Sequence, residues 1–232
     1  MKRAVDRRGT IGELLVWLLV GLSMLWVLAV SWGTVNSRPV WMDEAASWQS
    51  ATENSFGSLV VNGDDDSRHP SLSFIVIKAV LGVTGGGEAG SVELLWLRAG
   101  ALGAGVLAVG MAGLLGRVAL GRFGAVGCAV LAANDPVLLA QSQQARMFSL
   151  LMLGQTLAMA CAVVVLRGGV WGGVLGRLRL LAALGCGLGL TVAFNAVYLG
   201  LVVFGAVALA GVWAVLWAWW RGREVAGAGW GG

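Results

Sequence analysis

Residues 11–33 read IGELLVWLLVGLSMLWVLAVSWG, an apolar run with one charged side chain, Glu13. A membrane-spanning α-helix needs about 20 consecutive apolar residues, so this run is long enough to cross a bilayer. It follows the basic start MKRAVDRRGT, is too long for the core of a signal peptide, and has no small-residue cleavage pattern near its end. We therefore expect an uncleaved first membrane span.

The composition of the whole chain agrees with this expectation. Of 232 residues, 58% are hydrophobic and 12% are charged, and the mean hydropathy is +0.81. Water-soluble proteins carry about 25% charged residues, so a globular cytosolic enzyme, a disordered protein and a disulfide scaffold are excluded. The net charge of +4 does not indicate nucleic-acid binding, because the basic residues lie in short clusters between apolar runs. The three cysteines lie inside apolar runs without metal-ligand spacing and predict no redox or zinc chemistry.

Five further apolar runs predict an all-α, polytopic membrane protein with about six transmembrane helices. They cover residues 95–116, 124–141, 147–166, 180–198 and 199–220. The last two runs must turn near residues 194–198 with almost no loop, so one long tilted helix over 178–220 stays open as the alternative. We assign residues 1–220 to a transmembrane module and residues 221–232 to a short cytoplasmic tail.

The basic residues orient these helices. In the six-span arrangement eleven of the 16 Lys and Arg side chains fall on one side, namely Lys2, Arg3, Arg7, Arg8, Arg117, Arg122, Arg167, Arg177, Arg179, Arg221 and Arg223. Basic residues concentrate on the cytoplasmic side of membrane proteins, so we expect a multi-pass plasma-membrane protein with both termini in the cytoplasm. Eight of the 12 acidic residues lie between Thr34 and Leu97, in a long external loop at 34–95.

Residues 70–84 of that loop are apolar but too few to span a bilayer comfortably, and Lys78 stands in their middle. Pro70 precedes the segment, and three glycines at 85–87 follow it. We expect a juxtamembrane helix in the outer interface. A crossing here would turn every later arginine cluster outward, against the charge rule.

Small residues recur at every fourth position of the second span. They are Gly100, Ala104, Ala108, Ala112 and Gly116. These positions share one helical face, so we expect another helix to pack closely against it.

Asp43 and Glu44 follow Trp41 just beyond the first span. Adjacent acids at a membrane surface are commonly solvated and have no further role. The functional alternative is that one of them, sheltered by the bilayer edge, acts as a general base toward an acceptor hydroxyl. Burial beside a second acid raises the pKa of a carboxyl, which is the direction that this role requires.

The only histidine, His69, stands before Pro70 at the head of the juxtamembrane helix. A single loop histidine is usually a surface residue, but this position also suits a hydrogen bond to a substrate. Asp64-Asp65-Asp66 could join His69 around a divalent cation, although three consecutive acids are more typical of a solvated turn. We assign no metal ligands and no cofactor and keep the cation as a minor alternative.

A polar patch at 141–146 interrupts two apolar runs and should lie at the outer surface, level with Asp43. Gln143, Gln144 and Arg146 offer hydrogen bonds and a guanidinium that can hold two phosphate oxygens, which suits an anionic lipid headgroup. A simple interhelical turn is the alternative. Arg98, at the outer end of the second span, predicts either a snorkelling anchor or a phosphate contact.

Taken in order, these pieces resemble the N-terminal half of a membrane glycosyltransferase of the GT-C fold, in the protein O-mannosyltransferase and aminoarabinose transferase group (glycosyltransferase family 39). The family shows an Asp-Glu pair, a His-Pro-Pro-Leu helix start, an Arg-Leu-Pro-Ser-Ala-Leu-like helix start, a Gly-Arg-Arg-Leu-Phe-Gly-like turn and a Tyr-Ser-Gln-Glu-Ala-Arg-Met-Tyr-like stretch. Here the corresponding stretches are residues 41–44, 69–72, 97–102, 121–124 and 141–148. The resemblance covers about residues 10–200. Gln141, Gln144 and Ser71 depart from the family pattern.

The resemblance implies an inverting transferase that moves a mannose-like or other sugar from a polyprenyl-phosphate donor to an acceptor hydroxyl on the external face. Asp43 would be the catalytic base with Glu44 beside it, and His69, Gln143 and Arg146 would lie at the donor and acceptor site. Such chemistry needs a base and a cationic grip on the leaving phosphate, and no nucleotide-binding loop. The expected partners are the lipid-linked donor and membrane lipid.

Two other functions stay open at this stage. Members of that family continue through further spans, so a non-catalytic half-transferase that binds lipid phosphate, or a partner subunit supplying the missing C-terminal half, is the alternative. A transporter is the third hypothesis, but the predicted spans hold few ionisable residues beyond Glu13 and Asp135, both near helix ends, which disfavours an ion pathway.

Overall fold

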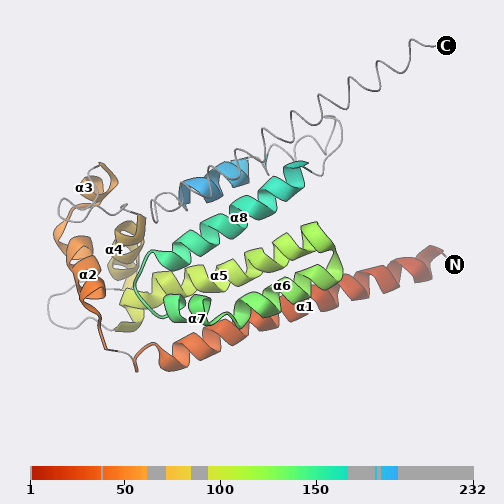
Figure 1. Cartoon of the computed structure of the whole chain (residues 1–232), viewed down its shortest axis with the longest axis horizontal. Helices are drawn as coiled ribbons and strands as arrows, with labels where there is room; N and C mark the ends of the chain where they lie inside the picture. The colour runs from red at the N-terminus through yellow and green to blue at the C-terminus, as the bar shows by residue number, and fades with distance from the viewer. Residues whose placement is uncertain are drawn as a thin grey trace, which may run out of the picture.

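The computed structural model describes residues 2–37, 39–61, 72–84, 94–166, 181 and 184–192, and every element in these ranges is an α-helix (Figure 1). Within these ranges three helices are long and apolar enough to cross a membrane: α1 (Lys2–Thr34) over Thr10–Thr34, α5 (Leu94–Leu120), and α8 (Phe148–Leu166) over Phe148–Val165. These helices match the first, second and fourth predicted spans within a few residues.

The predicted span at 124–141 is not one straight helix. It consists of α6 (Arg122–Ala133) and α7 (Pro136–Ser142), which meet at an angle of 61°. Pro136 is the cause, because a proline has no N–H to continue the α6 hydrogen-bond ladder and disfavours helical geometry in the residue before it. The Asp135 side chain accepts a hydrogen bond from the Val137 N–H (2.8 Å) and so begins the new helix.

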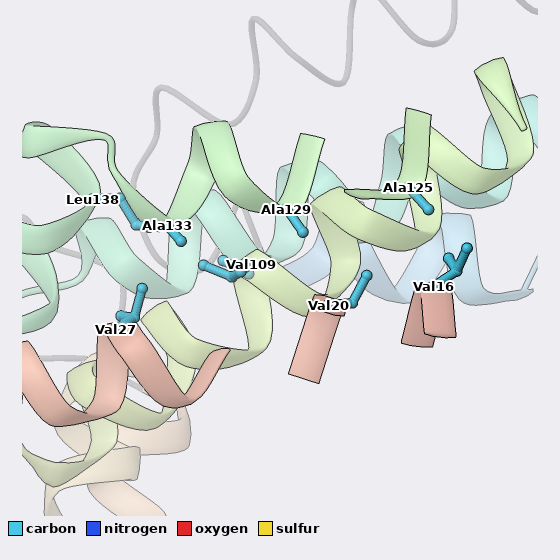
Figure 2. Packing of buried hydrophobic residues seen from close by; sticks show 9 residues of the cluster. Val16, Val20, Val27, Val109, Ala125, Ala129, Ala133 and Leu138 are labelled. Atoms are coloured by element: carbon cyan, nitrogen blue, oxygen red, sulfur yellow. The ribbon is translucent and has the colours of Figure 1, made fainter. Parts of the chain in front are cut away.

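The helix α5 is the centre of the bundle and packs against α1, α4, α6, α7 and α8. Figure 2 shows valines of α1 and α5 facing a row of alanines from α6. The buried cluster consists of Val16, Val20, Val27, Ala108, Val109, Ala125, Ala129, Ala133 and Leu138. Many large apolar side chains of α1 are exposed instead, as suits a helix with one face toward lipid.

Small residues let α5 and α6 approach closely, as the fourth-position pattern predicts. Ala104, Ala108 and Ala112 are buried. A Cβ added at Gly116 would lie 2.1 Å from the Gly124 carbonyl oxygen, so only glycine fits at this crossing. Gly121 forms the tight turn between the helices with φ 84°, in the left-handed region that glycine adopts without strain.

A small charge cluster joins α1 to the turn between α5 and α6. Glu13 accepts hydrogen bonds from Arg117 Nη2 (2.5 Å) and from Arg122 Nε (3.0 Å). All three side chains are partly exposed. This cluster marks one end of the bundle, here called the Glu13 end.

The opposite end, here called the loop end, carries α2 (Met42–Glu53), α3 (Phe56–Val61) and α4 (Leu72–Thr84) beside the start of α5 (Figure 1). The predicted segment at 70–84 is helical over Leu72–Thr84, its place at the membrane surface stays a prediction, and α2 and α3 were not predicted. A separate apolar cluster joins α2 and α4 to α5 and to the turn between α7 and α8. It contains Ala51, Ile77, Leu81, Leu97 and Ala145, with Trp48 and Trp96 packed against it.

Residues 184–192, inside the fifth predicted span, are helical and lie along α8. A Cβ at Gly185 would meet Cys161, and one at Gly189 would meet the Ala158 backbone, so this segment runs antiparallel to α8. The predicted span at 199–220, its alternative of one long helix over 178–220, and the tail at 221–232 lie outside the described residues.

Candidate functional site

Two ion pairs lie next to each other at the loop end, and both join α2 to distant parts of the chain. Arg146 Nη2 donates to Asp43 Oδ2, and Arg98 Nη2 donates to Glu44 Oε2. Arg146 belongs to the turn between α7 and α8, and Arg98 belongs to α5. Adjacent residues of α2 therefore hold one arginine each.

The Glu44–Arg98 pair is completely buried, with both side chains 0% exposed. Arg98 donates from Nε to Oε1 (2.9 Å) and from Nη2 to Oε2 (2.7 Å), which is the two-point geometry of the strongest carboxylate–guanidinium pairs. The same carboxylate accepts hydrogen bonds from the Ala145 N–H (2.7 Å) and the Trp41 N–H (3.2 Å). The bond from Trp41 also satisfies a free N–H at the start of α2.

Arg98 completes this buried network with two backbone carbonyls. It donates from Nη1 to the carbonyl of Val35, just after α1, and from Nη2 to that of Pro39 (3.2 Å). One ion pair thus connects the end of α1, the start of α2, α5 and the turn between α7 and α8. Arg98 is not a snorkelling anchor in this structure, because its side chain is buried and engaged by Glu44, while its role as a phosphate contact stays a prediction.

The hydrogen bonds around Glu44 determine its protonation. Burial by itself would raise the pKa of this carboxyl. The bonds from Arg98, Ala145 and Trp41 outweigh burial and hold the pKa of Glu44 below its ordinary value of 4.5. The expectation that burial raises the pKa is therefore wrong for Glu44, which is an ionised, structurally engaged group.

The Asp43–Arg146 pair is more open to solvent. The side chain of Asp43 is 68% exposed and that of Arg146 is 25% exposed. The sequence prediction that the patch at 141–146 lies level with Asp43 is confirmed by this contact. Because exposed ion pairs contribute little to folding, both groups can exchange their partner for a ligand at small cost.

Unpartnered buried polar atoms concentrate beside Arg146. Among the described residues five buried side-chain N or O atoms have no hydrogen-bond partner: Trp48 Nε1, Gln141 Oε1, Gln143 Oε1, Arg146 Nε and Ser149 Oγ. Four of them belong to residues 141–149. Such groups are few in folded proteins, so their concentration in residues 141–149 is unusual.

A hollow of about 390 Å³ opens nearby between α2, α3 and α4, with Phe56 and Leu81 among its lining residues. Lys78 lies at its edge and donates to the Ala51 carbonyl (2.9 Å). This bond caps the last turn of α2, where free carbonyls favour a cation. Lys78 therefore has a structural role in joining α4 to α2.

The remaining predicted site residues divide as follows. Gln143 is buried next to Arg146, and Gln144 is half-buried, its N–H donating to the Gln141 carbonyl (3.3 Å). His69 and Asp64-Asp65-Asp66 lie outside the described residues, so the cation alternative stays a prediction. Within the described ranges no three His, Cys, Asp or Glu side chains gather as metal ligands.

Sequence reasoning placed Trp48 beside the acidic pair, but it missed Ser149 and the pairing of Glu44 with Arg98. One signal for the pairing was available. A Glu three residues after the residue that precedes a helix commonly accepts the N–H of that preceding residue, so Glu44 could have been assigned to the N-terminus of α2. No protein family, curated protein or solved structure matches this chain.

Proposed function

We propose that this protein is a membrane glycosyltransferase that moves a sugar from a polyprenyl-phosphate donor to an acceptor hydroxyl, with Asp43 as the general base. One observation carries the proposal: Asp43 and Arg146, 103 residues apart, form an accessible ion pair at one end of a bundle whose helices are long and apolar enough to cross a membrane. A base and a cationic phosphate grip are the two groups that this chemistry requires. The ordered motifs of the sequence support the same assignment.

The ion pair suggests how binding and catalysis are linked. The donor phosphate competes with Asp43 for the Arg146 guanidinium, which can hold two phosphate oxygens. Asp43, once released, accepts the proton of the acceptor hydroxyl. The acceptor oxygen forms a bond to the anomeric carbon while the bond from that carbon to the phosphate oxygen breaks, and the lipid phosphate leaves with the electron pair. Attack opposite to the leaving group inverts the configuration.

Ser149 is 0% exposed and Gln143 is 4% exposed, so they would meet the hydroxyl groups of a sugar only if the turn between α7 and α8 opened to admit it. A phosphate only accepts hydrogen bonds from its surroundings, whereas a sugar hydroxyl both donates and accepts. The unpartnered Gln143 Oε1 needs a donor, and Ser149 Oγ can take either role. This mixture favours a ligand that carries hydroxyls as well as a phosphate.

We further propose six transmembrane spans, with both termini cytoplasmic and the site on the external face of the plasma membrane. In this arrangement α4 lies in the outer interface. The gathering of α2, α3 and α4 at the loop end, opposite the arginines that pair with Glu13, supports this orientation.

The test is transfer of labelled sugar from a polyprenyl-phosphate donor in membranes that contain this chain. Asp43→Asn should abolish transfer, and Arg146→Lys should weaken it because a lysine cannot grip two oxygens. Glu53→Gln is the matched control, since Glu53 is an exposed acid at the other end of α2. Transfer that survives Asp43→Asn would refute Asp43 as the base. Donor binding without transfer in the parent chain would support a non-catalytic lipid-phosphate-binding protein instead.

A further inference from the structure

We propose that the buried Glu44–Arg98 pair positions Asp43 and Arg146 against each other. Glu44 directly follows Asp43, and Ala145 directly precedes Arg146. The hydrogen bond from the Ala145 N–H to Glu44 Oε1 (2.7 Å) therefore links α2 to the turn between α7 and α8, one residue away from both Asp43 and Arg146. Asp43 and Arg146 are here called the outer pair. The contact between the outer side chains follows from this buried connection.

The outer pair is too exposed to fix its own geometry. With Asp43 68% exposed and Arg146 25% exposed, water and salt screen their attraction. The turn that carries Arg146 has short local hydrogen bonds, from the Gln144 N–H to the Gln141 carbonyl (3.3 Å) and from the Arg146 N–H to the Gln144 carbonyl (2.7 Å), which shape the turn but do not attach it to α2. Ala145 packs in the apolar cluster with Ala51, Ile77, Leu81 and Leu97, and the buried bond to Glu44 adds a directed restraint to this non-directional contact.

Arg98 in turn fixes Glu44. Its two bonds to the carboxylate, at 2.9 and 2.7 Å, define one orientation of the carboxylate plane. Its bonds to the carbonyls of Val35 and Pro39 attach the guanidinium to the connection between α1 and α2. Glu44 is thus held on α2 and on α5, with one oxygen directed at Ala145.

Stability alone does not account for a charged pair at this place. Well-packed apolar side chains of similar volume commonly replace a buried ion pair without loss of stability. A carboxylate and a guanidinium differ from apolar side chains in defining a single register between the segments they join. Glu44 and Arg98 are therefore positioning residues, and their consequence for transfer rests on the proposed function.

The experiment measures the proximity of positions 43 and 146 directly. Asp43→Cys and Arg146→Cys are combined after replacement of Cys128, Cys161 and Cys186 by alanine, and the full chain is treated with a short bifunctional thiol reagent. We compare the cross-linking rate with and without the double change Glu44→Leu, Arg98→Met, which removes both buried charges together. Glu13→Gln is the control, because it removes an acid from an ion-pair cluster at the other end of the bundle.

We expect the Glu44→Leu, Arg98→Met protein to fold and to cross-link about tenfold more slowly, the change that corresponds to about 1.4 kcal/mol of lost restraint. Glu13→Gln should leave the rate unchanged. An unchanged rate in the folded double variant would overturn the proposal. Glu44→Asp is the second variant, should the double change not fold: it keeps the buried charges but shortens the reach to Ala145, so it too should slow cross-linking, and an unchanged rate would equally overturn the proposal.

Sugar transfer provides a measurement that a purely structural role of Glu44 and Arg98 would not change. Misplacement of reacting groups by about 1 Å costs roughly 100-fold in rate, so kcat per folded molecule should fall about that much while the donor KM changes little. A loss that only follows the folded fraction would contradict a positioning role. If the parent chain transfers no sugar, the proposed function fails, while the cross-linking rate still decides whether Glu44 and Arg98 position this pair.

Discussion

Neutralising Glu44 alone should be among the most destabilising single changes in this protein. Glu44→Gln keeps the size of the side chain but leaves the Arg98 guanidinium, 0% exposed, without a counter-charge. Breaking a buried ion pair from one side costs about 3 to 5 kcal/mol, because the remaining charge stays desolvated. In a chain of 232 residues this corresponds to a fall of roughly 6 to 20 °C in the unfolding temperature.

The assay is thermal unfolding of the purified protein in detergent, with Glu13→Gln as the matched control. Glu13 is 32% exposed and its partners are 35% and 46% exposed, so Glu13→Gln should lower the unfolding temperature much less than Glu44→Gln does. Adding Arg98→Met to Glu44→Gln should recover most of the lost stability, because the unpaired charge is then removed as well. Equal shifts for Glu44→Gln and Glu13→Gln would refute the buried network.

Three further predictions concern pH, packing and topology. Because the pKa of Glu44 lies below 4.5 in the folded protein, its contribution to stability is present above pH 4.5 and is lost as the pH falls through the lower folded-state pKa. Unfolding temperatures measured at successively lower pH values should therefore fall more steeply in the parent than in a double variant with Glu44→Gln and a neutral residue at position 98. Parallel curves would contradict this. Gly116→Ala should cost about 1 to 3 kcal/mol of stability, because its Cβ would lie 2.1 Å from a carbonyl oxygen of α6. Gly103→Ala, whose Cβ has nothing within 4 Å, should not destabilise the protein. Equal unfolding temperatures for the two variants would contradict the close crossing of α5 and α6. Ser37→Cys should react with a membrane-impermeant thiol reagent on intact cells and Leu120→Cys should not, and the reverse pattern would refute the proposed orientation.

The membrane helices were predictable because long apolar runs have few alternatives. The helices α5 and α8 begin and end within a few residues of the predicted spans, and α4 occupies the predicted juxtamembrane segment. The break between α6 and α7 was missed, although Asn134-Asp135-Pro136 interrupts the apolar run at 124–141. Pro136 divides that run by removing a backbone N–H, an effect that hydropathy does not record.

The site was predictable only in part. The proximity of Asp43 to residues 141–146 followed from placing both at the same membrane surface, and their ion pair confirms it. The partner of Arg98 did not follow, because pairing across 54 residues depends on how α2 folds back over α5. Sequence reasoning placed Glu44 beside the catalytic base and gave Arg98 either a snorkelling or a phosphate-binding role, since it treated polar groups at the membrane surface as accessible. The structure buries both and leaves Asp43 and Arg146 accessible.

The most direct test of the central claim is the affinity for a polyprenyl-phosphate sugar before and after Asp43→Asn, measured together with transfer. If the donor phosphate competes with Asp43 for Arg146, removing the carboxylate charge should tighten donor binding by up to about fivefold, the equivalent of an exposed ion pair of about 1 kcal/mol. The same change should abolish transfer. Donor binding that is unchanged or weaker in Asp43→Asn, with transfer retained, would contradict the proposed function.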